Sequence, residues 1–388
     1  MSVFDELVGQ DEVVAQLVAA AAAAADGGGA GMTHAWLFTG PPGSGRSNAA
    51  RAFAAALQCP GQGCGHCKIC HQALGGTHPD VAVIVPEGLH LKIDEAREVI
   101  ARSSRAPTRG RWQVTLIEDA DRMEERTSNT LLKAVEEPPP HSVLLLCAPS
   151  AEDLLPTIRS RCRLVPLRTP PSDAVAGVLV DRDGVDPAMA AFAARAAQGH
   201  IGRARRLATD EGARTERSHV LALPRLLGSV GSALVAARDL VDAAKAESDV
   251  LAGSRHAGER EALSTALGGG ATGKGYAGGA PKGGAGALKD LEKRQKSRGT
   301  RTQRDALDRA LVDLAAFYRD VLSLQLGAGA TSVHADLSEQ AATIARGSTA
   351  EQTLRRIDAV LACRVAIDAN VAPLLAVEAM ALALRTGT

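Results

Sequence analysis

The stretch TGPPGSGRS at residues 39–47 restricts the fold more than any other part of the sequence. It follows the frame of a phosphate-binding loop, G-x-x-x-x-G-K-[ST], except that Arg46 stands where the motif has lysine. A short apolar run at 35–38 precedes the loop, and a helical pattern over 47–58 follows it. Strand, loop and helix in this order are the context in which the motif binds phosphate, so the sequence predicts an α/β nucleotide-binding-type domain. A glycine-rich turn without a ligand is the alternative.

The residues of the loop have separate expected roles. Gly40, Gly43 and Gly45 permit turns that point backbone N–H groups towards a phosphate, and Ser47 is a candidate Mg²⁺ ligand. The usual lysine reaches the β- and γ-phosphates as a compact charge, whereas Arg46 is longer, planar and forked. The substitution is compatible with nucleotide binding and unfavourable for hydrolysis.

A second departure lies in VTLIEDAD, residues 114–121. A hydrolytic protein of this kind carries Asp and then Glu after the strand, to hold Mg²⁺ and to activate water. Here Glu118 precedes Asp119, so the first carboxylate is one methylene longer and the second one shorter. Because about 1 Å of misplacement can cost ~100-fold in rate, the sequence predicts weak or absent ATPase activity. It leaves the binding of ATP or ADP and Mg²⁺ open.

Short apolar runs alternate with helical patterns over residues 1–168. Such runs are typical of strands covered on both faces, and their alternation with helices predicts a parallel sheet. The strand candidates are 35–38, 81–85, 114–117, 143–148 and 163–167, and further helices are expected at 93–104 and 124–137.

The sequence pattern of the rest of the chain predicts helices. A break at 169–173, TPPSD, precedes an Ala-rich pattern that predicts a small helical lid at 169–210. Residues 211–388 show no strand pattern and predict a larger all-α domain, interrupted by a flexible Gly-rich insertion at 268–287. Residues 288–304 then carry seven Lys or Arg against two acids. They are either a solvated face or arm, which we favour, or a phosphate-contacting segment.

Four cysteines cluster directly after the helical pattern that follows the loop. Cys59, Cys64, Cys67 and Cys70 follow C-x4-C-x2-C-x2-C within a Gly-rich stretch, a spacing that lets four thiolates surround one ion. We predict a structural Zn²⁺ module at 59–70, because four thiolates leave no open position for catalysis. Unmetallated thiols or an iron–sulfur cluster are the alternatives.

Composition limits the partners and the compartment. Lys and Arg balance Asp and Glu at 44 each, so no global field points to nucleic acid or membrane. No run of about 20 strongly apolar residues could span a bilayer, and acidic residues come early in the chain. A cytoplasmic protein with no membrane partner is expected.

Several motifs occur in a recognisable order. They are LVGQDEVV (7–14), the phosphate loop, the cysteine cluster, IEDADRM (117–123), SNTLLKAVEEPP (128–139), LPTIRSRC (155–162), GHIGRARRLA (199–208) and NVAPLLAVEAM (370–380). In this order they resemble bacterial clamp-loader AAA+ subunits, in particular the delta-prime type of DNA polymerase III. The resemblance covers nearly the whole chain outside 268–287, and the Ala- and Gly-rich composition is similar to that of actinobacterial proteins.

The resemblance implies a fold and further site residues. It implies an AAA+ domain, a helical lid and a C-terminal oligomerisation collar. Arg161 takes the place of the arginine finger that reaches the ATP of a neighbouring subunit, where it would stabilise charge on the transferring phosphoryl group. A surface ion pair is the other interpretation of this residue.

The family's remaining nucleotide contacts map onto four places. Val8, Gly9 and Gln10 match the adenine-contact stretch, and Ser150 is the candidate first sensor. Gly202 stands where the ATP-driven subunits have the second-sensor arginine, and Arg203 follows one position later. One step is about 100° of helix rotation, so Arg203 is a third departure from hydrolytic competence.

The resemblance also implies partners. They are gamma/tau and delta subunits in a pentameric ring, the sliding clamp and primer–template DNA, within the DNA polymerase III holoenzyme. Two alternatives stay open. One is an ATP-driven gamma/tau-type subunit, which the three departures and the absence of a long tail after residue 388 disfavour. The other is a free-standing AAA+ DNA-remodelling ATPase.

Overall fold

The computed structural model describes residues 2–25, 31–86, 88–91, 93–103, 105–266 and 284–387. The chain divides into two compact units, Met1–Thr209 and Asp210–Thr388. The first unit contains the sheet and the helices that follow it up to α9, and the second unit is helical. No helix among the described residues is both long and apolar enough to cross a membrane.

The first unit is built on one five-stranded parallel sheet. Each predicted strand is present: β1, β3 and β4 are buried along their whole length, whereas the edge strand β5 buries only Val165. The strand order is β2-β3-β4-β1-β5, which places β1 between β4 and β5. The strands are β1 (Ala35–Thr39), β2 (Val81–Ile84), β3 (Gln113–Ile117), β4 (Ser142–Ala148) and β5 (Arg163–Pro166).

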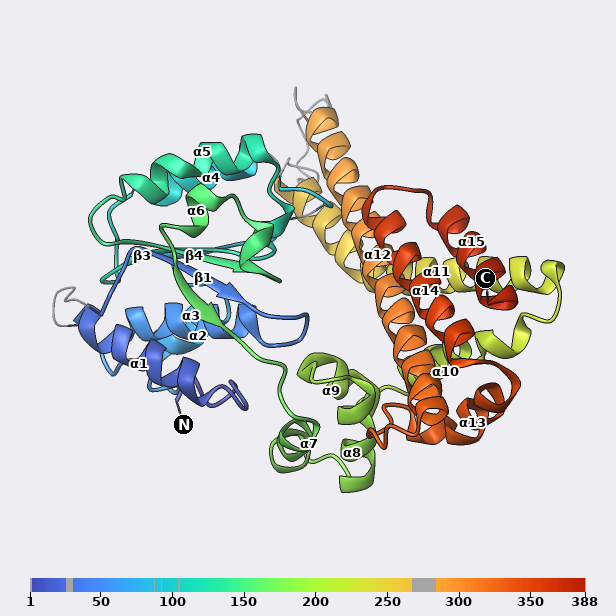
Figure 1. Cartoon of the computed structure of the whole chain (residues 1–388). Helices are drawn as coiled ribbons and strands as arrows, with labels where there is room; N and C mark the ends of the chain where they lie inside the picture. Colours follow the sequence, from blue (N-terminus) through green and yellow to red (C-terminus); the bar gives the residue numbers. More distant parts are fainter. Residues whose placement is uncertain are drawn as a thin grey trace. The chain divides into compact units, whose positions relative to one another are not determined.

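Helices cover both faces of this sheet. Figure 1 shows α1, α2 and α3 on one face and α4, α5 and α6 on the other. The helices are α1 (Asp11–Ala25), α2 (Arg46–Gln58), α3 (Lys68–Leu74), α4 (Ile93–Ser103), α5 (Glu125–Glu136) and α6 (Pro156–Arg159). The predicted fold class, an α/β domain with a parallel sheet followed by helical regions, is confirmed.

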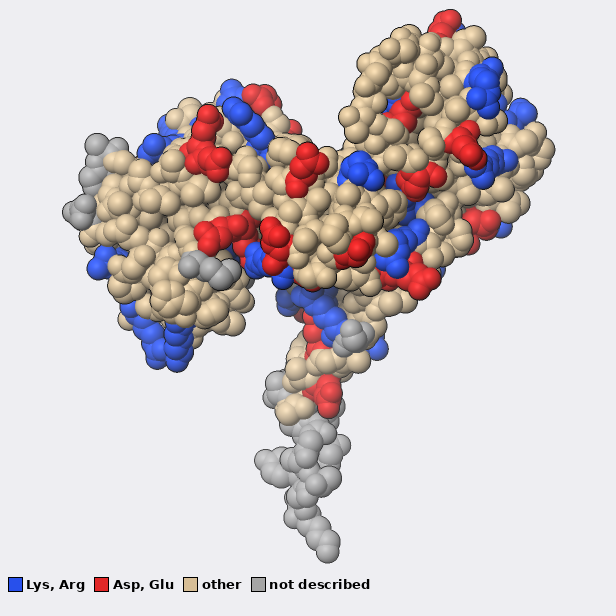
Figure 2. Space-filling view, turned by 90° about the horizontal axis from the view of Figure 1, so that it is seen from below, with Lys and Arg blue, Asp and Glu red and all other residues tan. Residues whose placement is uncertain are grey.

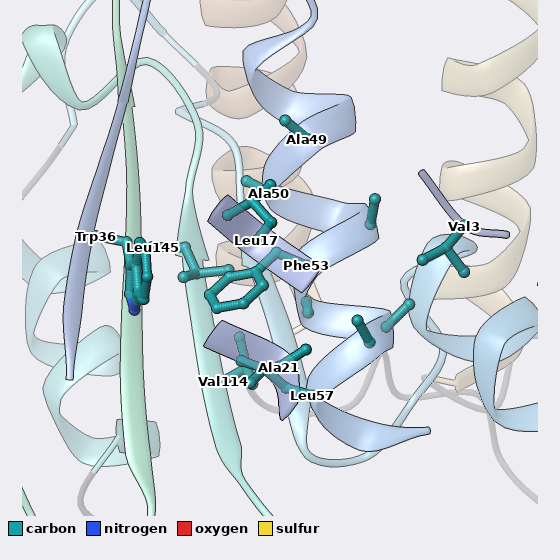
Figure 3. Close-up of a cluster of buried hydrophobic side chains, with 14 of the residues drawn as sticks. Val3, Leu17, Ala21, Trp36, Ala49, Ala50, Phe53, Leu57, Val114 and Leu145 are labelled. Atoms are coloured by element: carbon teal, nitrogen blue, oxygen red, sulfur yellow. The ribbon is translucent and has the colours of Figure 1, made fainter. Parts of the chain in front are cut away.

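Small residues let α2 approach the sheet closely. Ala49 and Ala50 are fully buried, and Phe53 of the same helix fills the space against Trp36 of β1, with ring centroids 4.8 Å apart (Figure 3). The N-terminus of α2 carries the phosphate loop. This packing therefore fixes the loop relative to β1.

A buried carboxylate holds the chain segment that leads into β3. Asp80 is 1% exposed and accepts hydrogen bonds from the backbone N–H groups of Thr108, Arg109 and Gly110 at 2.6–2.8 Å and from the Thr108 hydroxyl at 2.7 Å. Burial alone would raise the pKa of Asp80, but these bonds outweigh it and lower the pKa to about 2.

We expect Asp80→Ala to lower the free energy of unfolding by about 3 kcal/mol or more, because three buried N–H groups lose their acceptor. The contribution of Asp80 is present above the ordinary pKa of 3.8 and is lost as the pH falls towards about 2. Urea unfolding of the wild type and the variant at pH 7 and pH 3 measures both effects. Equal stability of the two proteins at pH 7 would contradict the prediction.

Three short helices complete the first unit. They are α7 (Ser172–Asp181), α8 (Pro187–Ala196) and α9 (Ile201–Thr209), as the Ala-rich pattern predicts. Asp186 begins α8 by accepting hydrogen bonds from two backbone N–H groups of its first turn. The predicted division into a domain at 1–168 and a lid at 169–210 stays a prediction.

The second unit has one hydrophobic core, which is built from Leu307, Leu311, Leu314, Phe317 and other apolar side chains. Its helices are α10 (Glu211–Leu226), α11 (Val230–Ala266), α12 (Gly284–Leu326), α13 (Ser338–Gly347), α14 (Ala350–Asp368) and α15 (Pro373–Thr386). The all-α character predicted for 211–388 is present in the described residues.

The flexible insertion predicted at 268–287 is only partly within the described residues. Residues 268–283 lie outside them. The last four positions, 284–287, form the start of α12 instead of a flexible segment. Extending an existing helix adds one hydrogen bond for each residue fixed, which is sufficient for this short Gly-Ala stretch.

Candidate functional site

The phosphate loop joins β1 to α2 at the carboxyl edge of the sheet, where ligands of open α/β sheets bind. Gly40, Gly43 and Gly45 have φ values of 148°, 88° and 92°, a region that favours glycine. The Gly40 N–H donates to the carbonyl of Pro149 at 3.1 Å, which fastens the loop to the end of β4. The three glycines are therefore required for this turn.

Arg46 does not extend away from the loop. It is the first residue of α2, and its Nη1 donates to the carbonyl oxygen of Gly40 at 2.8 Å. The guanidinium group thus bonds to the loop's own backbone. Ser47 follows it in the first turn of α2 and is partly exposed.

The carboxylate at the expected metal position is already paired. Nε and Nη2 of Arg51 donate to Oε1 of Glu118 at 3.1 and 2.8 Å, and both side chains are partly buried. An arginine on the carboxylate cancels the charge that would attract Mg²⁺. Arg46 and Glu118 are therefore both engaged within the chain.

Asp119 occupies a left-handed backbone conformation, with φ of 51°. Its carboxylate lies 3.8 Å from Nε of Arg122. Burial and the nearby Asp119 raise the pKa of Asp121 above its ordinary value. The segment after β3 is thus a compact group of carboxylates and arginines at the carboxyl edge of the sheet.

A histidine covers the phosphate loop. A Cβ placed on Gly43 would lie 2.5 Å from Cβ of His200, so the two backbones are in close contact. The N–H of Arg203 donates to Nδ1 of His200 at 3.2 Å, and Gly202 lies against the same imidazole. The start of α9 therefore packs on the loop through His200, and the backbone of Arg203 lies beside that histidine.

The expected adenine-contact stretch is tied to the end of β5. Nε2 of Gln10 donates to the carbonyl of Arg168 at 2.6 Å, and Oε1 accepts from the Arg168 N–H at 3.2 Å. Gly9 lies against Pro171, at the beginning of α7. Val8 and Gly9 border a hollow of about 480 Å³ whose lining comes from residues 2–18, without the phosphate loop.

Ser150 serves a local structural role. Its hydroxyl bonds to Glu152, and its N–H donates to Asp153 at 2.8 Å, which caps the short helical turn after β4. The predicted sensor position is thus next to the loop strand, with its hydroxyl engaged in this cap.

Arg161 lies two residues after the end of α6, and its side chain is 41% exposed. Its Nη2 is 3.1 Å from Oε1 of Glu136, at the end of α5, and its Nη1 donates to the carbonyl of Thr157 at 2.9 Å. Both contacts are at the surface, where an ion pair contributes little to stability. The guanidinium is therefore accessible to a neighbouring chain.

The four cysteines converge as the spacing predicts. Their Sγ atoms all lie within 4.8 Å of one another, and Sγ of Cys59 is 3.7 Å from those of Cys64 and Cys67. Tetrahedral Zn²⁺ with Zn–S bonds of about 2.3 Å places sulfurs roughly 3.8 Å apart, so the cluster fits this ion. Burial would raise the pKa of Cys59, but the N–H groups of Cys64 and Gly63 outweigh it and lower the pKa to about 6.

The cysteine loop also anchors the N-terminal segment. The carbonyl of Gly63 accepts from the Val3 N–H at 2.9 Å and from the Ser2 hydroxyl at 3.3 Å. Val3 is itself buried in the core of the first unit. Ordering of residues 59–70 therefore supports the segment that leads to Gln10.

Two site residues were missed by sequence reasoning, Arg51 and His200. Arg51 follows Ser47 by four positions, so helical spacing places it beside the loop, and this signal could have found it. His200 follows Gly199, whose φ of 88° marks a turn, but sequence alone gives no distance between it and Gly43.

The parallel sheet with a glycine-rich loop after an inner strand places the chain in the class of P-loop α/β proteins. Residues 10–171 match the family model described as DNA polymerase III, delta subunit. The relatives that match this chain over a similar stretch are named as delta' and gamma/tau subunits of the same polymerase.

Three relatives illustrate the range of subunit types and sequence identities. The delta' subunit of Pseudomonas aeruginosa is 38% identical over 135 residues, which are 33% of this chain and 41% of the relative. The delta' subunit of Bacillus subtilis is 32% identical over 162 residues, 41% of this chain and 49% of the relative. The gamma/tau subunit of Mycobacterium tuberculosis H37Rv is 32% identical over 191 residues, 47% of this chain and 32% of the relative.

The chain thus spans less than half the length of these curated relatives. Because both subunit types match, the similarity does not distinguish delta' from gamma/tau. The relatives come from several bacterial groups, and an actinobacterial origin stays a prediction.

Solved structures give a weaker likeness. A gamma-subunit-related protein from Thermotoga maritima is 17% identical, covers 91% of this chain and 94% of its own, and has a TM-score of 0.39. A RuvB mutant from the same organism is 19% identical over 56% of this chain and 66% of its own, with a TM-score of 0.38. Because both TM-scores are this low, no statement about the fold of this chain rests on these structures.

Proposed function

We propose that the chain is a clamp-loader subunit of the delta-prime type that has weak or no ATPase activity of its own. The pairing of Glu118 with Arg51 carries this proposal, because it leaves the expected Mg²⁺ position without a free carboxylate. The return of Arg46 to the Gly40 carbonyl supports the same conclusion. A gamma/tau-type subunit would instead need both groups directed at Mg²⁺ and phosphate.

In the proposed role the chain supplies Arg161 to the ATP of a neighbouring subunit. The exposure of Arg161 and its two surface contacts support this role, since a neighbouring phosphate could replace Glu136 as its partner at little cost. The proposed partners are gamma/tau and delta subunits in a pentameric ring, the sliding clamp and primer–template DNA. The proposed location is the cytoplasm.

We expect the isolated chain to bind Mg²⁺–ATP weakly and to show little ATP turnover. A variant with Arg46→Lys, Arg51→Ala and Glu118→Asp should bind at least roughly tenfold more tightly, since it restores a compact cation and frees a carboxylate. Isothermal titration calorimetry with a non-hydrolysable ATP analogue and Mg²⁺ measures the change. Arg46→Lys alone is the matched control and should gain little, because Glu118 stays paired.

Two results would contradict the proposal of a delta-prime-type subunit with weak or no ATPase activity. Turnover by the isolated chain at a rate near that of a reconstituted assembly would favour the gamma/tau alternative. Tight Mg²⁺–ATP binding by the wild type would show that the Arg51–Glu118 pair opens readily.

A further inference from the structure

The long helices α11 and α12 extend well beyond the core of the second unit. The core residues on α11 end at Ala244, and those on α12 begin at Ala306. Residues 245–266 and 284–305 therefore form a helical hairpin outside this core, about 30 Å long at 1.5 Å per residue. Figure 1 shows α11 and α12 side by side. With little apolar burial to require such a hairpin for folding, an interaction role is the natural reason for it.

Polar contacts join the two helices of the hairpin. Glu259 of α11 accepts hydrogen bonds from Arg298, Gln295 and Arg255. These bonds lower the pKa of Glu259 to about 2, and the bond from Arg298 has the largest effect. The hydroxyl of Ser248 donates to the carbonyl of Gly299 at 3.0 Å.

The arginines of the basic segment 288–304 are largely engaged within the second unit. Arg298 pairs with Glu259, Arg301 lies 3.7 Å from Asp305, and Arg304 donates to Asn370 at 2.9 Å. These three arginines support the fold, and Lys289, Lys293 and Lys296 are exposed, as is Arg294. A test of phosphate binding that replaces these three arginines would therefore also disturb the fold.

The lysines form a stripe. Lys289, Lys293 and Lys296 are exposed and follow one another at the i, i+4, i+7 spacing of a single helix face. The stripe is about 10 Å long, so its ammonium groups can contact neighbouring phosphates of one B-DNA strand. Figure 2 shows basic and acidic side chains together on the hairpin, so the charge of each face decides what binds there.

A groove of about 470 Å³ runs between the two helices beside this stripe. Its small residues include Ala252, Gly253 and Gly299. Across the groove lie Lys245 and Arg260. The groove and the stripe together carry the cations Lys245, Arg260, Lys289, Lys293 and Lys296 and the carboxylates Asp249 and Glu292, of which Glu292 lies 3.6 Å from Arg260.

We propose that this lysine face of the hairpin binds the phosphodiester backbone of a nucleic acid. The positive excess and the spacing of the lysines match a row of phosphates. The described residues that line the groove are polar, charged or small. Protein interfaces are depleted in lysine and centre on apolar residues, so this face fits nucleic acid better than an acidic protein. The proposal depends neither on Arg161 nor on nucleotide binding at the loop.

The test measures binding of the full-length chain to a fluorescein-labelled primer–template DNA by anisotropy across a salt series. We expect the triple variant Lys289→Gln, Lys293→Gln, Lys296→Gln to bind roughly tenfold more weakly and to reduce the slope of log K against log[salt] by about 2 to 3. The matched control is Arg225→Gln, Arg238→Gln, Arg385→Gln, which removes three exposed cations of the same unit outside the hairpin. This control should leave the slope nearly unchanged.

A Lys→Arg triple at 289, 293 and 296 should restore binding, because it keeps the charge, and it distinguishes lost contacts from lost folding. Equal weakening by the hairpin and control triples would overturn the proposal, because binding would then follow net charge alone. Displacement of the DNA by polyglutamate at an equal concentration of charge would also overturn it, in favour of an acidic protein partner.

Discussion

Replacing Arg161 with alanine is expected to depress ATP hydrolysis by the reconstituted assembly while the assembly stays intact. An arginine supplied in trans contributes on the order of 10³ or more to the rate at the site that it serves, so that site should fall nearly silent. The polar contacts of the side chain with Glu136 and the Thr157 carbonyl lie at the surface, so its removal should cost under about 1 kcal/mol of stability. Steady-state ATPase assays with size-exclusion chromatography of the same samples measure both effects.

Two further variants sharpen this test. Arg159→Ala removes a similarly exposed arginine two positions earlier, whose Nη1 lies 3.6 Å from Glu152, and it should leave ATP hydrolysis unchanged. Arg161→Lys keeps the charge but loses the planar fork, so it should stay impaired. Wild-type hydrolysis by an assembly that contains Arg161→Ala would refute the arginine-finger role, and it would leave the hairpin proposal untouched.

The strands could be predicted from the sequence because burial on both faces leaves a local signature. Runs such as VLLLCA at 143–148 are continuous and apolar, and β4 is buried at all of its seven positions. The start of α12 could not be predicted, because Gly-Ala stretches carry no periodic pattern and the helix there grows from its neighbour.

The candidate site likewise has features that the sequence could predict and features that it could not. The cysteines lie within twelve residues of one another, so their spacing alone predicts that they converge. Arg51 and Glu118 are 67 positions apart, and only the sheet that places α2 beside the end of β3 brings them together. The contact of His200 with Gly43 likewise depends on how α9 packs. Sequence identified the departures at Arg46 and Glu118 but not the partners that engage these side chains.

We expect the purified chain to contain one Zn²⁺ and Cys70→Ser to lose it. Cys70 is fully buried, and its N–H donates to Sγ of Cys67 at 3.4 Å, so a change at this position disturbs the whole ligand set. Structural Zn²⁺ contributes folding free energy, and we expect a loss of several kcal/mol, or roughly 10 °C in Tm for a unit of this size. Elemental analysis and thermal unfolding followed by circular dichroism measure the metal and the stability.

Loss of the metal should also affect the N-terminal segment. Without the metal, the loop carbonyl of Gly63 loses its fixed position, and the Val3 N–H loses its partner. Hydrogen exchange at Val3 should therefore quicken in Cys70→Ser, whereas exchange in α12 should not change. Cys162→Ser is the matched control, because this partly buried thiol lies outside the cluster and should leave both zinc and Val3 protection intact. A wild-type chain that is free of zinc when purified without chelators would exclude the metal module, and retention of zinc by Cys70→Ser would remove this residue from the ligand set.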